Sequence, residues 1–157
     1  MIPKSERNRI FALQKKAVRA VIGTHSKAHT NIIFHSLQIL PFESLIRFNS
    51  LIFMFKYSEM KVPSTFLNTW PTVYQQNPNR LTRSANELYI QRVLINILNN
   101  HPFFILPRIW NDFKETFKTT TKLTIFKRQL KRYLLDSLDL LPCQDPQCYA
   151  CNKSSQH

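Results

Sequence analysis

The sequence predicts a mainly α fold, an irregular helical domain with room for one short β-hairpin. Two stretches, one near each end of the chain, carry apolar residues at the spacing of an α-helix. The 157 residues are 43% hydrophobic and 12% aromatic, which excludes general disorder and is enough to bury a core. The length indicates one domain, which we place at residues 1–140, followed by a flexible Cys-containing tail at residues 141–157.

The first predicted helix spans residues 7–22. Its apolar residues recur at helical spacing, and the stripe expected to face the core includes Ile10, Leu13 and Ala17. Basic residues fall on the opposite side of this helix. Gly23 stands directly after the last apolar residue, at the place where a left-handed C-terminal cap is wanted.

Two more helices are expected after the first. A short one has Phe34 and Leu37 on its apolar side. Pro41 can occupy the first position of the next helix, which runs over residues 41–57. The buried stripe of this helix is expected to include Phe48, Leu51 and Phe55.

Residues 58–87 are expected to be irregular, because Pro, Asn and Thr interrupt them repeatedly. The segment 88–94 fits either a strand or the start of a helix. The proline-bounded segment 102–107 fits a strand or an extended core segment, so a hairpin between residues 88 and 106 stays open. A short helix around residues 109–117 follows.

The last predicted helix spans residues 121–138 and has the clearest pattern. Expected core residues from this part of the chain are Trp110, Phe126, Leu130 and Leu134. A contiguous basic patch lies beside the apolar stripe, because side chains four positions apart are neighbours on a helix surface. The patch consists of Lys127, Arg128, Lys131 and Arg132.

The charge balance favours a polyanionic partner. Lys and Arg number 22 against nine Asp and Glu, a net charge of +13, and a chain this basic attracts phosphate polymers. We predict sequence-non-specific binding of RNA or DNA. The expected phosphate contacts are Lys15, Lys16, Arg19, Arg80, Arg83, Lys127, Arg128, Lys131 and Arg132. The alternative is a basic surface that only contacts water.

Nothing in the sequence predicts an active site. With one glycine, a phosphate-cradling loop and a nucleophile elbow are both excluded. The close carboxylate pairs, Asp112 with Glu115 and Asp136 with Asp139, lack a flanking base or metal ligand. The longest purely apolar run, 51–55, is far short of a membrane span of about 20 residues, and the N-terminus has no signal core. We expect an intracellular protein of the nucleus or cytoplasm, not a secreted one, without a membrane partner.

The tail holds all three cysteines of the chain, which fits a reducing compartment better than a disulfide framework. Together with the last residue they supply four potential zinc ligands: Cys143, Cys148, Cys151 and His157. Their spacing matches no zinc finger or zinc knuckle. A zinc site and a reduced tail without metal both stay open.

Several short motifs, taken in order, resemble the C-terminal region of reverse transcriptases from non-LTR retrotransposons of the LINE type, close to the jockey-like group. The resemblance covers about residues 7–136. Its pieces are Leu13-Gln-Lys-Lys-Ala-Val-Arg19, Ala28-His-Thr30, Ile39-Leu-Pro41, Phe53-Met54, Thr82-Arg-Ser84, Trp110-Asn111 and the run from Phe126 to Leu135. The chain departs from the pattern at Gln91, where such proteins often have Pro, after Asn111, and in the tail.

The resemblance implies a fragment of an RNA-directed DNA polymerase that lies downstream of the catalytic palm. Palm regions of this family carry paired aspartates, and this chain has no Asp-Asp dipeptide. The implied remaining activity is binding of RNA or DNA by basic helix faces, without a catalytic residue of its own. A protein-interaction module and a relic open reading frame without function are the alternatives.

Overall fold

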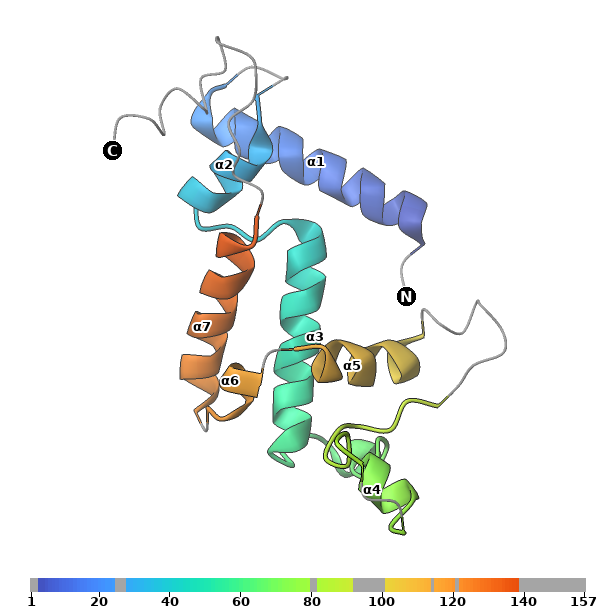
Figure 1. Cartoon of the computed structure of the whole chain (residues 1–157). Coiled ribbons are helices and arrows are strands. Elements are labelled where there is room, and N and C mark those ends of the chain that lie inside the picture. The colour runs from blue at the N-terminus through green and yellow to red at the C-terminus, as the bar shows by residue number, and fades with distance from the viewer. Residues whose placement is uncertain are drawn as a thin grey trace. The chain divides into compact units, whose positions relative to one another are not determined.

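The computed structural model describes residues 3–24, 28–79, 82–91, 101–113, 115–120 and 122–138 (Figure 1). Their helices are α1 (Lys4–Ile22), α2 (Thr30–Ser36), α3 (Phe42–Ser58), the 3-10 helix η1 (Ser64–Phe66), α4 (Val73–Gln76), α5 (Pro102–Asn111), α6 (Glu115–Lys118) and α7 (Leu123–Asp136). Within these residues there is no strand, and β-pairing is limited to an isolated antiparallel bridge between Thr72 and Leu88. The expected mainly α fold is confirmed.

The described residues cluster into two compact units. We call residues 3–46 and 128–138 the terminal unit, and residues 47–127 the central unit. The long helices α3 and α7 run from one unit into the other. The boundary that we expected at residue 140 lies outside the described residues and stays a prediction.

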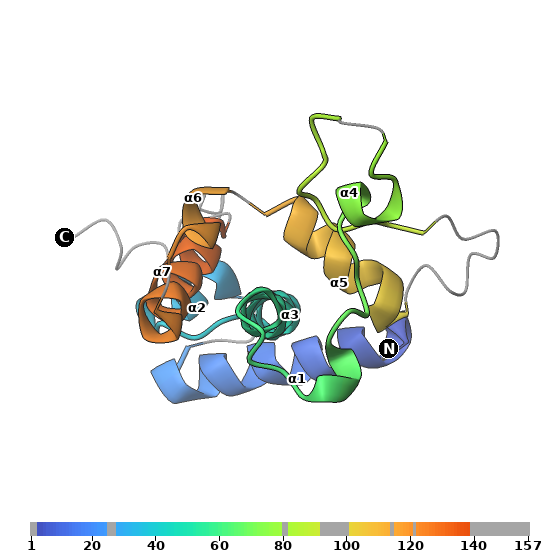
Figure 2. The same cartoon turned by 90° about the horizontal axis from the view of Figure 1, so that it is seen from below.

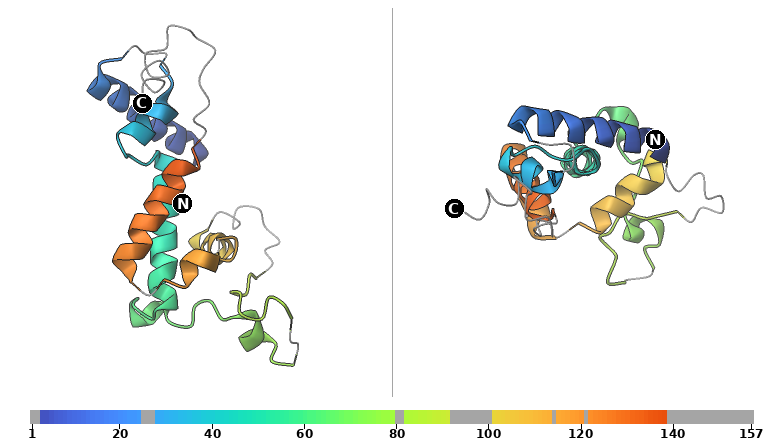
Figure 3. Two further views of the ribbon diagram at one scale, coloured as in Figure 1. Left: turned by 60° about the vertical axis from the view of Figure 1, so that its left-hand side comes forward. Right: turned by 90° about the horizontal axis from the view of Figure 1, so that it is seen from above.

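The core of the terminal unit lies where α1 packs against α2 (Figure 3). Val18 of α1, Ala28 from the connecting segment, and Ile33 and Phe34 of α2 are buried together. The ring of Phe11 stacks on Phe34 with centroids 6.2 Å apart. The expected burial of Phe34 is confirmed, and the predicted core residues Leu130 and Leu134 of α7 are also buried.

The apolar stripe that we predicted for α1 is wrong. Ile10 is 38% exposed, Leu13 is 64% exposed, and Ala17 is also exposed. The buried face is the neighbouring one, with Val18 at its centre. Two apolar stripes overlap on this helix, and the one that carries an aromatic ring faces α2, because a ring buries more area than the aliphatic residues beside it.

Two polar side chains of α1 bind the backbone of loops in the terminal unit. Gln14 donates from Nε2 to the carbonyl oxygen of Leu40 at 2.9 Å, and its Oε1 accepts from the backbone N–H of Phe42 at 2.8 Å. Arg19 donates from Nε to the carbonyl oxygen of Ala28 at 3.0 Å. These bonds satisfy backbone groups that no helix pairs, and they fix where α2 and α3 begin.

The first three helices end in the same way. Gly23 has a left-handed backbone with φ 71°, which confirms the predicted cap of α1. Its N–H bonds back three residues, to Ala20, and the next N–H bonds back five, the pattern of a Schellman motif. Gln38 and Met60, each with φ 54°, make the same two bonds after α2 and α3. A left-handed backbone is unfavourable for such residues by about 1–2 kcal/mol.

In the central unit, α3 packs against α7 and the segment after α5. Phe55 stacks on Phe126 with ring centroids 4.3 Å apart, and Phe113 meets the same Phe126 ring edge-on. The predicted burial of Phe55, Phe126, Leu51 and Trp110 is confirmed. Phe48 is half-buried.

The expectation of a strand or extended segment at residues 102–107 is wrong, because this segment is the first part of α5. The second strand of the open hairpin is therefore absent, and the segment 92–100 lies outside the described residues. Pro102 takes a first-turn position, which suits proline, and the Nδ1 of His101 accepts from the backbone N–H of Phe103 at 3.3 Å. The helix expected at 109–117 divides into α5 and α6, which end and begin on either side of Phe113.

A second proline inside α5 explains how Trp70 is held. Pro107 has no N–H, so the carbonyl oxygen of Phe103, four residues earlier, lacks its helical donor. The indole N–H of Trp70 donates to that oxygen instead, at 2.7 Å. The Tyr57 hydroxyl completes the fixation: it accepts from the backbone N–H of Trp70 and donates to its carbonyl oxygen, both at 3.0 Å.

The loop around α4 returns to α5 in the central unit (Figure 2). The side chain of Asn111 binds both backbone groups of Leu88: it accepts from the N–H at 3.0 Å and donates to the carbonyl oxygen at 2.8 Å. The bridge between Thr72 and Leu88 joins the two ends of the loop. The irregular stretch is thereby attached at its base to α5.

Candidate nucleic-acid interface

Helix α7 presents its basic residues to solvent, as its sequence pattern predicts. Lys127, Arg128, Lys131 and Arg132 are all exposed. The helix is held by the side chains between them, since Phe126, Leu130 and Leu134 are each at most 2% exposed. The backbone of α7 is thus anchored by its buried face, and the charged ends of the four basic side chains remain accessible to solvent.

Three of these cations surround a hollow of about 390 Å³ in the terminal unit. Arg128, Lys131 and Arg132 line it from α7, with Leu135 between them. Leu135 is only 1% exposed, so the hollow has a dense apolar base under a cationic rim. The opposite wall comes from the C-terminal end of α2 and consists of His35 and Gln38.

One carboxylate moderates the charge of the hollow. Asp136 lies 3.9 Å from Nε of Arg132 and 3.7 Å from Nε2 of His35, both measured from its carboxylate oxygens. Among the described residues, Arg128 and Lys131 have neither an ion pair nor a hydrogen bond through their side chains. Three cations therefore face one carboxylate, and two of the cations are available to an incoming anion.

The three basic residues predicted as phosphate contacts on α1 lie in different environments. Lys16 is exposed. Lys15 is half-buried and lies over the ring of Phe11, with Nζ 4.1 Å from the centroid. Arg19 is half-buried and uses Nε on the carbonyl of Ala28. The latter two take part in packing, so α1 offers a weaker anion surface than the hollow on α7.

Other predicted site residues lie elsewhere or outside the described part. Arg83 is exposed in the central unit. Arg80 and the four potential zinc ligands, Cys143, Cys148, Cys151 and His157, lie outside the described residues, so the zinc site stays a prediction. Within the described ranges no group of three or more His, Cys, Asp or Glu side chains could hold a metal ion. None of the helices there is long and apolar enough to cross a membrane.

Two residues of the hollow, His35 and Gln38, were missed by sequence reasoning. They lie about 90 residues before their α7 neighbours, so no local pattern links them to the basic patch. Gln38 owes its position to the left-handed end of α2, and its Nε2 donates to the carbonyl oxygen of His35 at 2.9 Å. A signal for either residue would have required the packing of α2 against the last helix.

Comparison of the chain with protein-family models, curated proteins and solved structures finds no match. The resemblance to retrotransposon reverse transcriptases therefore rests on the sequence motifs alone.

Proposed function

We propose that this chain is a nucleic-acid-binding fragment related to the C-terminal region of a non-LTR retrotransposon reverse transcriptase, with no catalytic site of its own. It binds the phosphate backbone of RNA or DNA without sequence preference. The observation that carries the proposal is the hollow on α7, where Arg128 and Lys131 are exposed and unpaired among the described residues.

The shape of the hollow suits a phosphate better than a solvated helix face would. Its cations come from successive turns of one helix whose opposite face is buried, so the backbone positions that carry them are fixed before binding. Arginine offers a planar set of donors that matches phosphate oxygens, and lysine adds a compact charge. The net charge of +13 attracts a polyanion from a distance, and the hollow gives it a place of contact.

Several residues of the motifs that carry the family resemblance have structural roles in this chain. Gln14 and Arg19, from the first motif, bind the backbone at Leu40 and Ala28, which belong to the next motifs. Asn111, from the Trp-Asn motif, binds Leu88. Residues that hold loops in place are those that a related fold would need, so the motifs are consistent with a shared architecture.

The test uses a double variant that carries both Arg128→Gln and Lys131→Gln. Its binding to single-stranded RNA is compared with that of the unchanged chain in titrations at several salt concentrations. Each phosphate that the protein no longer neutralises lowers the slope of log affinity against log salt by about 0.7 for a single strand. We expect weaker binding and a slope reduced by about 1.4. Both substitutions keep side chains of similar length on an exposed face, so folding is retained.

A matched control removes the same two charge types elsewhere. Lys4 and Arg47 are exposed and do not line the hollow. The double variant Lys4→Gln with Arg47→Gln has the same net charge and is expected to bind with a nearly unchanged slope. Equal reductions of affinity in the two double variants would mean that net charge alone drives binding, and no measurable RNA affinity of the unchanged chain would overturn the proposal.

A further inference from the structure

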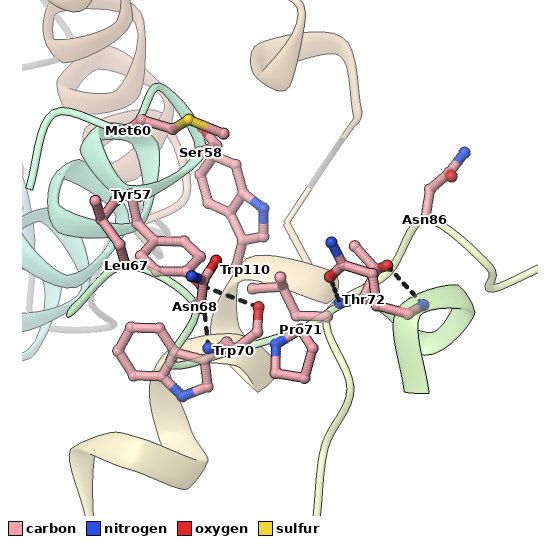
Figure 4. Close-up of a pocket in the computed structure, with 12 residues that line it drawn as sticks. Tyr57, Ser58, Met60, Leu67, Asn68, Trp70, Pro71, Thr72, Asn86 and Trp110 are labelled. Carbon is pink, nitrogen blue, oxygen red and sulfur yellow. Dashed lines mark hydrogen bonds between the residues drawn. The ribbon is translucent and has the colours of Figure 1, made fainter. Parts of the chain in front are cut away.

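A second hollow, of about 500 Å³, lies within the central unit (Figure 4). Its walls come from the end of α3, from residues 67–75, from Asn86 and Leu88, and from α5, and they include both tryptophans of the chain, Trp70 and Trp110. Tyr57 and Pro71 complete the flat apolar surfaces. A volume of this size is within the range of small-ligand pockets, roughly 300–1,000 Å³.

The indole of Trp110 leaves a hydrogen-bond donor unused in this hollow. The residue is only 8% exposed, and its Nε1 donates to no acceptor in the described part of the chain. The indole N–H of Trp70 is used by the carbonyl oxygen of Phe103. The Trp110 nitrogen, in contrast, is not among the buried side-chain atoms that lack a partner, so solvent or a ligand can reach it.

Asn68 adds a second unused polar group. Its carboxamide has no partner among the described residues, and it lines the hollow from an exposed left-handed position with φ 67°. An amide presents one acceptor and one donor side by side, the arrangement that pairs with the edge of a nucleobase. The other polar groups of the 57–75 wall are occupied: Tyr57 binds Trp70, and Thr72 and Gln75 bind each other.

We infer that this hollow takes one unpaired nucleobase from a bound single strand, an inference that rests on the proposed function. A base is flat and apolar on its faces, and it carries acceptors and donors along its edge. Aromatic walls with a free indole N–H and the free carboxamides of Asn68 and Asn86 match that chemistry, and proteins that read single-stranded RNA hold splayed bases in this manner. An aliphatic or benzyl side chain of a protein partner would leave these polar groups unsatisfied.

The two tryptophans make the test direct. Because both line the hollow and the chain has no other, the intrinsic fluorescence of the full chain reports on its occupancy. The probes are a single-stranded oligouridylate of about eight nucleotides and an abasic strand with the same number of phosphates. We expect the oligouridylate to change the tryptophan emission and to bind about tenfold more tightly than the abasic strand, whose phosphates still reach the basic residues.

Substitutions then identify the groups that hold the base. Asn68→Gly removes the carboxamide and tolerates the left-handed backbone. Trp110→Phe keeps a ring and removes the N–H. Each is expected to weaken oligouridylate binding about fivefold to tenfold and to leave binding of the abasic strand unchanged. Asn49→Ala, at an exposed asparagine of α3 that does not line the hollow, is the matched control and changes neither.

The possible outcomes separate the two proposals. Equal affinities for the two strands, with unchanged emission, would overturn the base site and leave phosphate binding in place. A fall in oligouridylate affinity in Asn49→Ala as large as in Asn68→Gly would also overturn it. If neither strand binds, the base site and the proposed function both fall. Should Trp110→Phe fail to fold, Asn68→Gly alone decides.

Discussion

The backbone nitrogen of Pro107, which carries no hydrogen, shapes the central unit. Because Pro107 has no N–H, the carbonyl oxygen of Phe103 is free to accept from the indole of Trp70, and this bond fixes a tryptophan 33 residues away in sequence. A proline inside a helix usually destabilises it by about 3 kcal/mol. Here the carbonyl oxygen that the proline leaves without its helical donor is satisfied by a side chain.

We predict energetic coupling between these two residues. Trp70→Phe leaves the Phe103 oxygen without a donor and is expected to lower the free energy of unfolding by about 1–3 kcal/mol. In a Pro107→Ala background the restored N–H can serve that oxygen, so the same substitution should cost about 1 kcal/mol less. Urea denaturation of the four proteins in the cycle measures the difference.

Val18→Ala provides the control for this cycle. It removes buried methyl groups in the core of the terminal unit, which shares no residue with the contacts of Pro107 and Trp70. Its effect should add to that of Pro107→Ala within about 0.5 kcal/mol. If the Trp70 and Pro107 effects are additive to the same degree, the bond between them contributes nothing specific.

At the scale of the elements, α1 offers the clearest test of which face is buried. Val18 is 4% exposed, whereas Leu13, which the spacing placed in the core, is 64% exposed. We expect Val18→Ala to lower the free energy of unfolding by about 1–3 kcal/mol and Leu13→Ala to change it by less than about 0.5 kcal/mol. Chemical denaturation gives both values. An equal decrease for the two variants would mean that the outer stripe of α1 is covered.

The sequence pattern located the long helices well but could not choose a face on α1. Helical spacing predicts α1, α3 and α7 within a few residues, because long amphipathic segments leave few alternatives. Two overlapping stripes on one helix are indistinguishable until the partner is known. The prediction for the segment 102–107 was wrong for another reason. Proline was interpreted as the limit of an extended segment, although the first turn of a helix also accepts proline.

The candidate site was predictable in part. The basic residues of α7 and their exposure follow from the pattern of one helix. The packing roles of Arg19 and Lys15 depend on the loop at Ala28 and the ring of Phe11, which spacing does not reveal. His35 entered the hollow only through the fold, since contacts across about 90 residues leave no local signal.

For the whole molecule, the charge of +13 persists when the chain unfolds, so part of any RNA binding needs no structure. A ligand raises stability only by its preference for the folded state. We predict that single-stranded RNA raises the melting temperature by a few degrees at low salt. The double variant with Arg128→Gln and Lys131→Gln should lose most of this shift. The control double variant with Lys4→Gln and Arg47→Gln should keep it.

Differential scanning fluorimetry with and without the oligonucleotide measures this shift, and added salt should reduce it. The comparison of the two variants separates fold-dependent contacts from general attraction. A shift that is the same in both variants, or absent from the unchanged chain, would mean that the folded hollow adds nothing to the attraction of a basic polymer.

The terminal unit joins the two ends of the described chain, and this has a consequence for biosynthesis. His35 and Gln38 are translated about 90 residues before the cations of α7. A growing chain therefore carries one wall of the hollow before the cations that face it have been made. Whatever anion the hollow holds, it can be held only by a polypeptide whose translation has passed α7.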